Sequence, residues 1–118
     1  MTMQKSGNDI HVTIDNIGGK VIKDTEKYEL TDNSHLNNLV LSKTRLRAKQ
    51  STNGHRHSGQ EEVYYFIAGE GKMELDYKEI NVKPGDIVLI EDNVFHKVHN
   101  TGDYYLDFIC VFEGRRKH

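Results

Sequence analysis

The chain has 118 residues, with 18 acidic and 16 basic side chains, seven histidines and a formal net charge of −2. This length predicts one domain with a core of its own, and the charge balance gives no basic field to hold nucleic acid. No apolar stretch approaches the roughly 20 residues of a membrane helix, and the first dozen residues lack the apolar centre of a signal peptide. We therefore expect a cytoplasmic domain, residues 1–118, that binds neither nucleic acid nor membrane.

The first third of the chain is polar and gives weak signals. Residues 1 to about 20 are expected to form an arm or an added edge strand. The stretch EKYELTDNSHLNNL, residues 26–39, is compatible with one short turn of helix. No window shows a convincing 3.6-residue apolar stripe, so no long helix is expected.

From residue 39 onward, short runs rich in β-branched and aromatic residues alternate with turn-forming clusters of Gly, Asn, Asp and Pro. The runs cover residues 39–48, 62–69, 72–82, 86–91 and 104–114. Many short strands separated by turns predict an all-β sandwich or barrel. Cys110, the only cysteine, lies in the last run and is expected to be a buried, unreactive thiol. The closing GRRKH is expected to be a solvated tail.

The stretch NGHRHSGQEEVYY, residues 53–65, gathers two histidines, two glutamates and two tyrosines. In an extended chain His55 and His57 point the same way and Arg56 points to the other side. An HxH pair alone is better explained by two surface histidines beside a turn. In the strand that follows, Glu62, Tyr64, Phe66 and Ala68 share one face, while Glu61 lies on the other and can stay in water.

A second cluster follows in FHKVHN, residues 95–100. His96 and His99 lie on opposite faces of a strand, so only one of them can join an interior site. Three imidazoles and one carboxylate form a mixed nitrogen and oxygen set suited to Mn, Fe, Co, Ni, Cu or Zn. Such groups are costly to bury together without a metal, which favours a metal site if the fold brings them together.

The spacing of these residues resembles the two motifs of the cupin superfamily. The first motif reads G(X)5HXH(X)3–4E(X)6G, and His55, His57, Glu62 and Gly69 occupy its last four places. The six-residue gap before Gly69 selects Glu62 over Glu61, in agreement with strand parity.

The second motif reads G(X)5PXG(X)2H(X)3N, and Gly85, His96 and Asn100 match it, which selects His96 over His99. The resemblance covers about residues 36–114. It implies a jelly-roll barrel, also called a double-stranded β-helix. It also implies one divalent transition metal held by His55, His57, Glu62 and His96 inside one end of the barrel.

Three positions depart from the motifs without removing a ligand. Lys49 stands where the first motif begins with Gly, and Glu91 and Asn93 replace the Pro and Gly of the second. Asn tolerates a left-handed backbone, so Asn93 is expected to keep the turn.

For other side chains near the predicted site, the sequence is compatible with more than one role. Tyr64 should face the lumen with Glu62, either as a general acid or base beside the metal or as a core tyrosine. Arg45 and Arg47 could bind an anionic substrate, although surface positions explain them better. Phe66, Val98 and Phe108 are expected in the core or the pocket wall.

Three functions of different classes are compatible with this pattern. The first is a metal-dependent enzyme on a small polar or anionic molecule, with lyase, dioxygenase, decarboxylase or sugar isomerase chemistry implied by the resemblance. The others are a small-molecule-binding module without chemistry and a metal-free barrel. A homodimer is also expected, because long β-runs leave sheet edges and faces that need cover.

Overall fold

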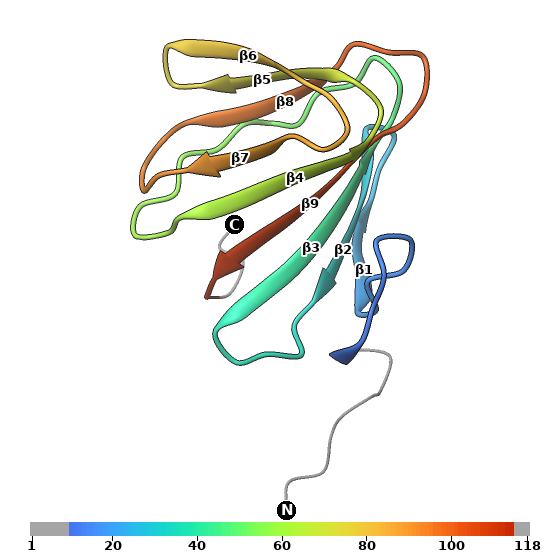
Figure 1. Cartoon of the computed structure of the whole chain (residues 1–118), viewed down its shortest axis with the longest axis vertical. Coiled ribbons are helices and arrows are strands. Elements are labelled where there is room, and N and C mark those ends of the chain that lie inside the picture. The colour runs from blue at the N-terminus through green and yellow to red at the C-terminus, as the bar shows by residue number, and fades with distance from the viewer. Residues whose placement is uncertain (1–9, 115–118) are drawn as a thin grey trace, which may run out of the picture.

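The structure is a computed structural model that describes residues 10–114, and this part of the chain forms nine strands and no long helix (Figure 1). The strands are β1 Lys20–Asp24, β2 Tyr28–Asn33, β3 Leu39–Leu46, β4 Glu62–Ala68, β5 Gly71–Leu75, β6 Lys78–Val82, β7 Ile87–Ile90, β8 His96–Asn100 and β9 Leu106–Glu113. None of these residues belongs to a helix of the length and apolarity needed to cross a bilayer.

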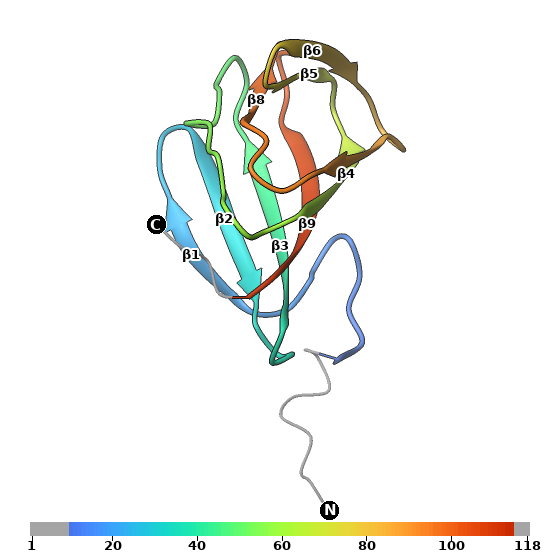
Figure 2. The same ribbon diagram turned by 90° about the vertical axis from the view of Figure 1, so that its left-hand side faces the viewer.

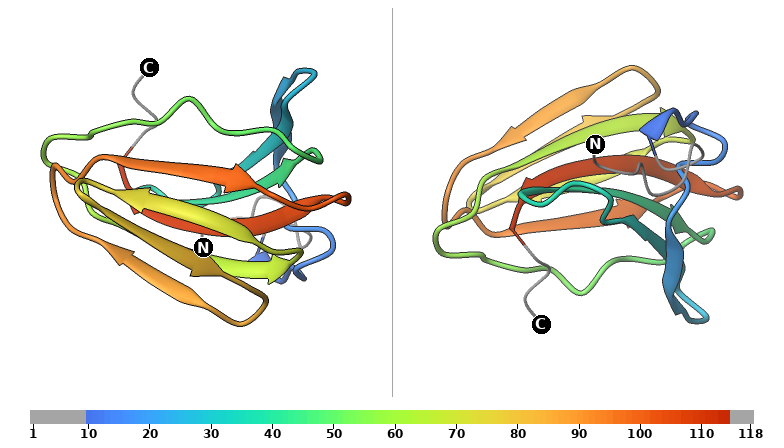
Figure 3. Two further views of the ribbon diagram at one scale, coloured as in Figure 1. Left: turned by 90° about the horizontal axis from the view of Figure 1, so that it is seen from above. Right: turned by 90° about the horizontal axis from the view of Figure 1, so that it is seen from below.

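The strands form two antiparallel sheets that curve around a shared interior. The larger has the order β1-β2-β3-β9-β4-β7 and the smaller the order β6-β5-β8. Figure 2 shows β1, β2 and β3 side by side along one wall, with the β5–β6 hairpin above them. In the end-on views of Figure 3 the β1–β2 hairpin and the β5–β6 hairpin lie on opposite sides of the barrel. This all-β architecture is the one predicted.

The segment between β3 and β4 completes the smaller sheet on its open side. Ser51 pairs with His99 and His55 pairs with His96 in isolated antiparallel bridges. The His55 and His96 backbones exchange two hydrogen bonds of 2.9 Å. The HxH segment is therefore held beside β8 although it forms no regular strand.

The interior has an apolar end and a polar end, both set by strand register. Leu46 pairs with Leu106 and Phe66 with Phe108, and these four side chains are almost fully buried. Four residues back along β3, Ser42 is buried opposite Cys110. The apolar end closes the barrel, which leaves the polar end for a site.

Three sequence-based expectations need correction or refinement. Residues 28–33 form strand β2, so the helical turn considered for residues 26–39 was wrong. All six positions pair with β3, because this pairing satisfies the backbone and buries Leu30, which isolated helix propensity cannot do. The run 72–82 is a hairpin, with Asp76 in a left-handed turn (φ 51°) between β5 and β6. The expected N-terminal arm covers residues 10–19 and is followed by edge strand β1. Residues 1–9 and the basic end of the tail lie outside the described range.

The outer face of the larger sheet carries exposed apolar side chains. Val63 of β4 lies between Leu89 of β7 and Val111 of β9. Leu89 is 72% exposed and Ile87, two residues earlier, is 61% exposed. We call this surface the outer band; it consists of Leu41, Val63, Tyr65, Ile87, Leu89, Ile109 and Val111.

Candidate metal centre

Three predicted ligands meet at the polar end of the barrel. Ligand atoms of His57, Glu62 and His96 all lie within 4.8 Å of one another. His96 Nε2 is 3.3 Å and His57 Nε2 is 3.7 Å from the same carboxylate oxygen, Glu62 Oε1. Glu62 and His96 are the first residues of β4 and β8, and His57 comes from the segment between β3 and β4. Each sheet therefore contributes one anchored ligand.

His55 lies beside this cluster, but it is not one of the three residues whose ligand atoms lie close together. Its ring centroid is 5.3 Å from that of His57 and 5.9 Å from that of His96, but its nitrogens fall outside the 4.8 Å set. All three imidazoles line the same pocket. The structure thus gathers the four predicted ligands, with three of them in tight contact.

The hydrogen bonds of His96 orient it as a ligand. Its Nδ1 lies 3.0 Å from the carbonyl oxygen of Val94; because a carbonyl only accepts, Nδ1 carries the proton. The lone pair of a neutral ring is then on Nε2, which is buried and makes no hydrogen bond of good geometry. A backbone carbonyl holding one ring nitrogen is how metal-binding histidines are commonly fixed.

The electrostatics of His96 are set by its burial and by Glu62. Burial lowers the pKa of His96, but the Glu62 carboxylate and the Val94 carbonyl outweigh it, so the pKa lies above its ordinary value of 6.5. The side chain of His96 is only 3% exposed and that of Glu62 only 7%. A cation is therefore favoured at this place, whether it is a proton or a metal.

Strand parity correctly separated the two glutamates. Glu62 is buried in the pocket, whereas Glu61 is exposed. The pattern continues along β4 through Tyr64 and Phe66, as predicted, and ends before Ala68, where a bulge shifts the register and exposes the side chain.

The two histidines of β8 are separated in the same way. His99 lies on the outer side, where its Nδ1 is 2.6 Å from Ser51 Oγ and its Nε2 is 2.6 Å from Glu74 Oε1. These contacts link β5, β8 and the segment between β3 and β4, so His99 stabilises the smaller sheet while His96 faces the pocket.

The turn after β7 holds the HxH segment in place. Asn93 has φ 64° and donates its backbone N–H to the His57 carbonyl at 2.9 Å. Arg56 points away from the site, as predicted: it bonds to the Asn93 carbonyl and pairs with Asp76 at 3.0 Å. Asn93 therefore does what the glycine of the second motif would do. Lys49, which replaces the first Gly of the first motif, also has a left-handed backbone, with φ 65°.

Tyr64 lies deeper in the lumen than the ligands. Its ring is buried, stacks on Phe108 at a centroid distance of 5.3 Å and meets His96 edge-on at 5.8 Å. The predicted position on the lumen face is confirmed, and its chemical role stays a prediction. Phe66 and Val98 are core residues, and Phe108 both packs in the core and lines the pocket.

Sequence reasoning missed much of the pocket wall. The cavity is about 50 Å³, room for a few water molecules or a ligand of few non-hydrogen atoms. Cys110 is buried as expected and also lines it. In the stretch LSKTRL, residues 41–46, uncharged Ser42 and Thr44 alternate with charged Lys43 and Arg45. This alternation could have predicted that Ser42 and Thr44 face the interior. The missed lining residues are Lys23, Tyr28, Leu30, Ser42, Thr44, Thr52, Gln60, Cys110 and Phe112.

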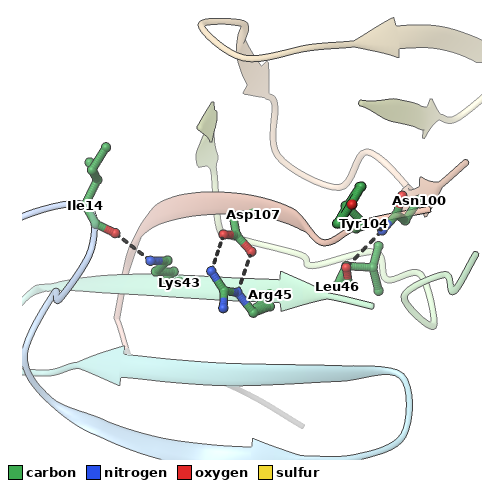
Figure 4. Close-up of polar contacts among 7 residues, drawn as sticks. All are labelled: Ile14, Lys43, Arg45, Leu46, Asn100, Tyr104 and Asp107. Atoms are coloured by element: carbon green, nitrogen blue, oxygen red, sulfur yellow. Dashed lines mark hydrogen bonds and ion pairs between the residues drawn. The ribbon is translucent and has the colours of Figure 1, made fainter. Parts of the chain in front are cut away.

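Arg45 and Arg47 do not enter the pocket. Arg45 makes two parallel hydrogen bonds to buried Asp107, at 3.0 and 2.9 Å (Figure 4). Its guanidinium also covers the Tyr105 ring. Arg47 pairs with Asp24 at 3.0 Å. Both arginines therefore link strands at the surface of the barrel. This agrees with the prediction that they are surface residues and not substrate-binding residues.

The residues at the cluster fit a divalent transition metal. They offer imidazole nitrogens and one carboxylate, the donor set that Mn, Fe, Co, Ni, Cu and Zn accept. The buried, unbonded Nε2 of His96 is a ligand atom left without another task in the described structure. The set would also leave coordination positions for a small molecule.

Comparison with known proteins agrees with this geometry. The family model of the cupin domain matches residues 43–112, more than half of the chain. The oxalate-binding protein of Thermotoga maritima is 31% identical over 72 residues, covering 61% of this chain and 60% of that protein. The match thus spans less than two thirds of that relative's length.

Solved structures show the same fold. A crystal structure of a predicted oxalate decarboxylase from Thermotoga maritima matches with a TM-score of 0.67 at 26% identity, covering 73% of this chain and 79% of that one. An uncharacterized protein with a double-stranded β-helix domain from Klebsiella pneumoniae matches with a TM-score of 0.76 at 18% identity, covering 88% and 89%. The chain belongs to the cupin family.

Proposed function

We propose that this cupin is a metal-dependent enzyme that acts on a small carboxylate, with His55, His57, Glu62 and His96 as the metal ligands. The observation that carries the proposal is the buried group of His57, Glu62 and His96, with His96 Nε2 directed at Glu62. The small cavity, whose lining includes the histidines and Lys23, and the likeness to an oxalate-binding protein support a compact anionic substrate. We propose one divalent metal per chain; the sequence and fold leave its identity open among Mn, Fe, Co, Ni, Cu and Zn.

The parts of the site would divide the work. A bound divalent metal would supply positive charge to polarise a carboxylate placed against it. Val94 and Glu62 hold the imidazole of His96 in place. The apolar wall of Phe108 and Phe112 excludes water from one side of the substrate.

Tyr64 is the proposed catalytic residue. Its ring is clamped between Phe108 and His96, so its hydroxyl would be held near a molecule bound at the cluster. There it would give or take a proton at Oη, a step that typically contributes about 10² to 10⁴ in rate.

The test is a turnover screen of metal-loaded protein against oxalate, other small carboxylates, sugars and sulfonium compounds. Loss of a carboxylate substrate with release of carbon dioxide or another product is the expected result. Tyr64→Phe keeps the ring and should lower turnover about 10² to 10⁴-fold with unchanged metal content. Undiminished turnover in this variant would remove Tyr64 from the chemistry while leaving the metal role intact.

A second candidate is a binding module without chemistry. It is favoured by one observation, the likeness to a protein described as oxalate-binding rather than as an enzyme. Saturable oxalate binding without turnover by any metal form would support it. Tyr64→Phe should then change ligand affinity by no more than one hydrogen bond, about 1 kcal/mol.

We also propose that two copies associate through the outer band. Strand β7 is the edge of the larger sheet in the described part of the chain, and its two most exposed apolar residues belong to the band. An exposed apolar face at a sheet edge is the kind of surface that a twofold dimer covers.

A further inference from the structure

Strand β1 contains a bulge that turns one lysine toward the pocket. Val21 pairs with Thr31, but Lys23 pairs with Leu30, so Ile22 is an extra residue in the ladder. In a regular ladder Ile22 would lie opposite Leu30, and Lys23 would lie opposite Glu29 on the outer face. A bulge commonly redirects a side chain in this way. It moves Lys23 to the face that Leu30 shares with the pocket.

Lys23 is the only lysine or arginine among residues 10–114 that line this pocket. It has no ion-pair partner among residues 10–114. The other cationic side chains near this wall are already used: Arg47 pairs with Asp24, and Lys27 bonds to Asn53. The Lys23 ammonium therefore has no ion-pair partner at the pocket within the described residues. The neighbouring Arg47 and Lys27 side chains are engaged in holding the β1–β2 hairpin in place.

The charges of the pocket can be summed from its lining. Among the lining residues in the described range, Glu62 is the only carboxylate and Lys23 the only permanently basic side chain. With neutral histidines, a divalent metal at Glu62 leaves one positive charge, and Lys23 adds a second. A dianion would neutralise both, whereas a monoanion would leave one positive charge uncompensated in a partly desolvated site.

We propose that Lys23 selects dianionic ligands, binding the second carboxylate of a small dicarboxylate whose first carboxylate lies at the metal cluster. This inference rests on the proposed function, because it names the charge class of the ligand at the same site. Ser42 and Thr44 add polar side chains to the pocket lining that the cluster and Lys23 share, as a two-ended anion requires. The cavity of about 50 Å³ limits the dicarboxylate to the shortest members.

The test compares oxalate with oxamate, in which an uncharged amide replaces one carboxylate. Dissociation constants are measured by calorimetry on metal-loaded wild type, Lys23→Met, Lys23→Arg and Lys20→Met, with the metal content of each determined. Lys20→Met is the matched control, since Lys20 lies on the same strand but does not line the pocket. Lys23→Met should weaken oxalate about tenfold, the loss of one charge-assisted hydrogen bond, with oxamate changed less than about twofold.

The outcomes separate this inference from the proposed function. Loss of oxalate preference in Lys23→Met, with preference kept in Lys23→Arg and Lys20→Met and equal metal content in all, supports Lys23 as the selecting residue. Wild type that binds oxalate and a Lys23→Met variant with the same preference would overturn the role of Lys23 and leave the function standing. Metal-loaded wild type that binds neither compound would overturn both.

Discussion

His96 is the residue at which protons and metal compete most directly. Its pKa lies above 6.5 because Glu62 and the Val94 carbonyl outweigh burial, and metal binding requires the neutral ring. Apparent metal affinity should therefore begin to fall above pH 6.5 and fall further as the other histidines protonate. Titration against a chelating dye from pH 8 to pH 5 measures this. Constant affinity over that range would contradict a histidine-rich site.

The same pKa shift predicts the pH dependence of stability in metal-free protein. A histidine whose pKa is raised on folding stabilises the fold below its unfolded pKa of about 6.5. That contribution disappears as the pH rises through the folded value. His96→Gln should thus lower the free energy of unfolding more at pH 5.5 than at pH 8.5, as measured by urea denaturation. An equal or reversed effect would contradict the Glu62 contact.

The ligand residues could be predicted from sequence because each has a local signal. Alternation along β4 distinguished Glu62 from Glu61, and the three-residue offset on β8 put His96 and His99 on opposite faces, with the motif spacing selecting His96. Lys23 and Gln60 could not be found in this way. Lys23 depends on a bulge in β1, and Gln60 is held by a hydrogen bond to the Glu113 carbonyl, 53 residues away in the chain.

Asn100 joins the end of β8 to the ends of its neighbours. Its buried Nδ2 lies 3.0, 3.1 and 2.7 Å from the carbonyls of Leu46, Arg47 and Tyr104. Figure 4 shows Asn100 beside Leu46 and Tyr104. Its Oδ1 accepts from Gly102 N–H at 2.9 Å. Asn100, which matches the second motif, therefore links the ends of neighbouring strands and does not belong to the cluster of candidate ligands.

Asn100→Asp should be strongly destabilising, because it replaces the donor with an oxygen facing three carbonyls. Each buried carbonyl left unpaired costs about 1–3 kcal/mol, so the free energy of unfolding should fall by at least about 2 kcal/mol. Asn37→Asp, at an exposed position, is the control. Denaturant unfolding at constant pH compares them, and equal stabilities would show that the hydrogen bonds contribute nothing.

The strands that carry large apolar residues were predictable, whereas β1 and β2 were not. β2 has the sequence YELTDN, and its two buried residues, Leu30 and Asn33, are three positions apart and so give no alternating pattern. Such a strand is defined by its partner β3 more than by its own composition. The hairpin at Asp76 was hidden for a related reason, since apolar residues continue on both sides of a two-residue turn.

The outer band is the surface through which we expect two copies of the protein to form a dimer in solution. Leu89 is 72% exposed at its edge, and a charge there would have to be buried in the proposed dimer. Leu89→Lys should shift the protein from dimer to monomer in light scattering at micromolar concentration. Tyr77→Lys, at the fully exposed β5–β6 turn outside the band, should remain a dimer. A monomeric wild type would contradict the proposal.

The metal content of matched glutamate variants tests the central claim most directly. Wild-type protein, purified without an affinity metal column and dialysed, should retain about one transition metal per chain, the ratio that one four-ligand site allows. Glu61→Gln alters an exposed neighbour and should retain the same amount, while Glu62→Gln should retain less and His96→Ala none. Elemental analysis that finds equal metal in all four proteins would contradict a centre built on Glu62 and His96.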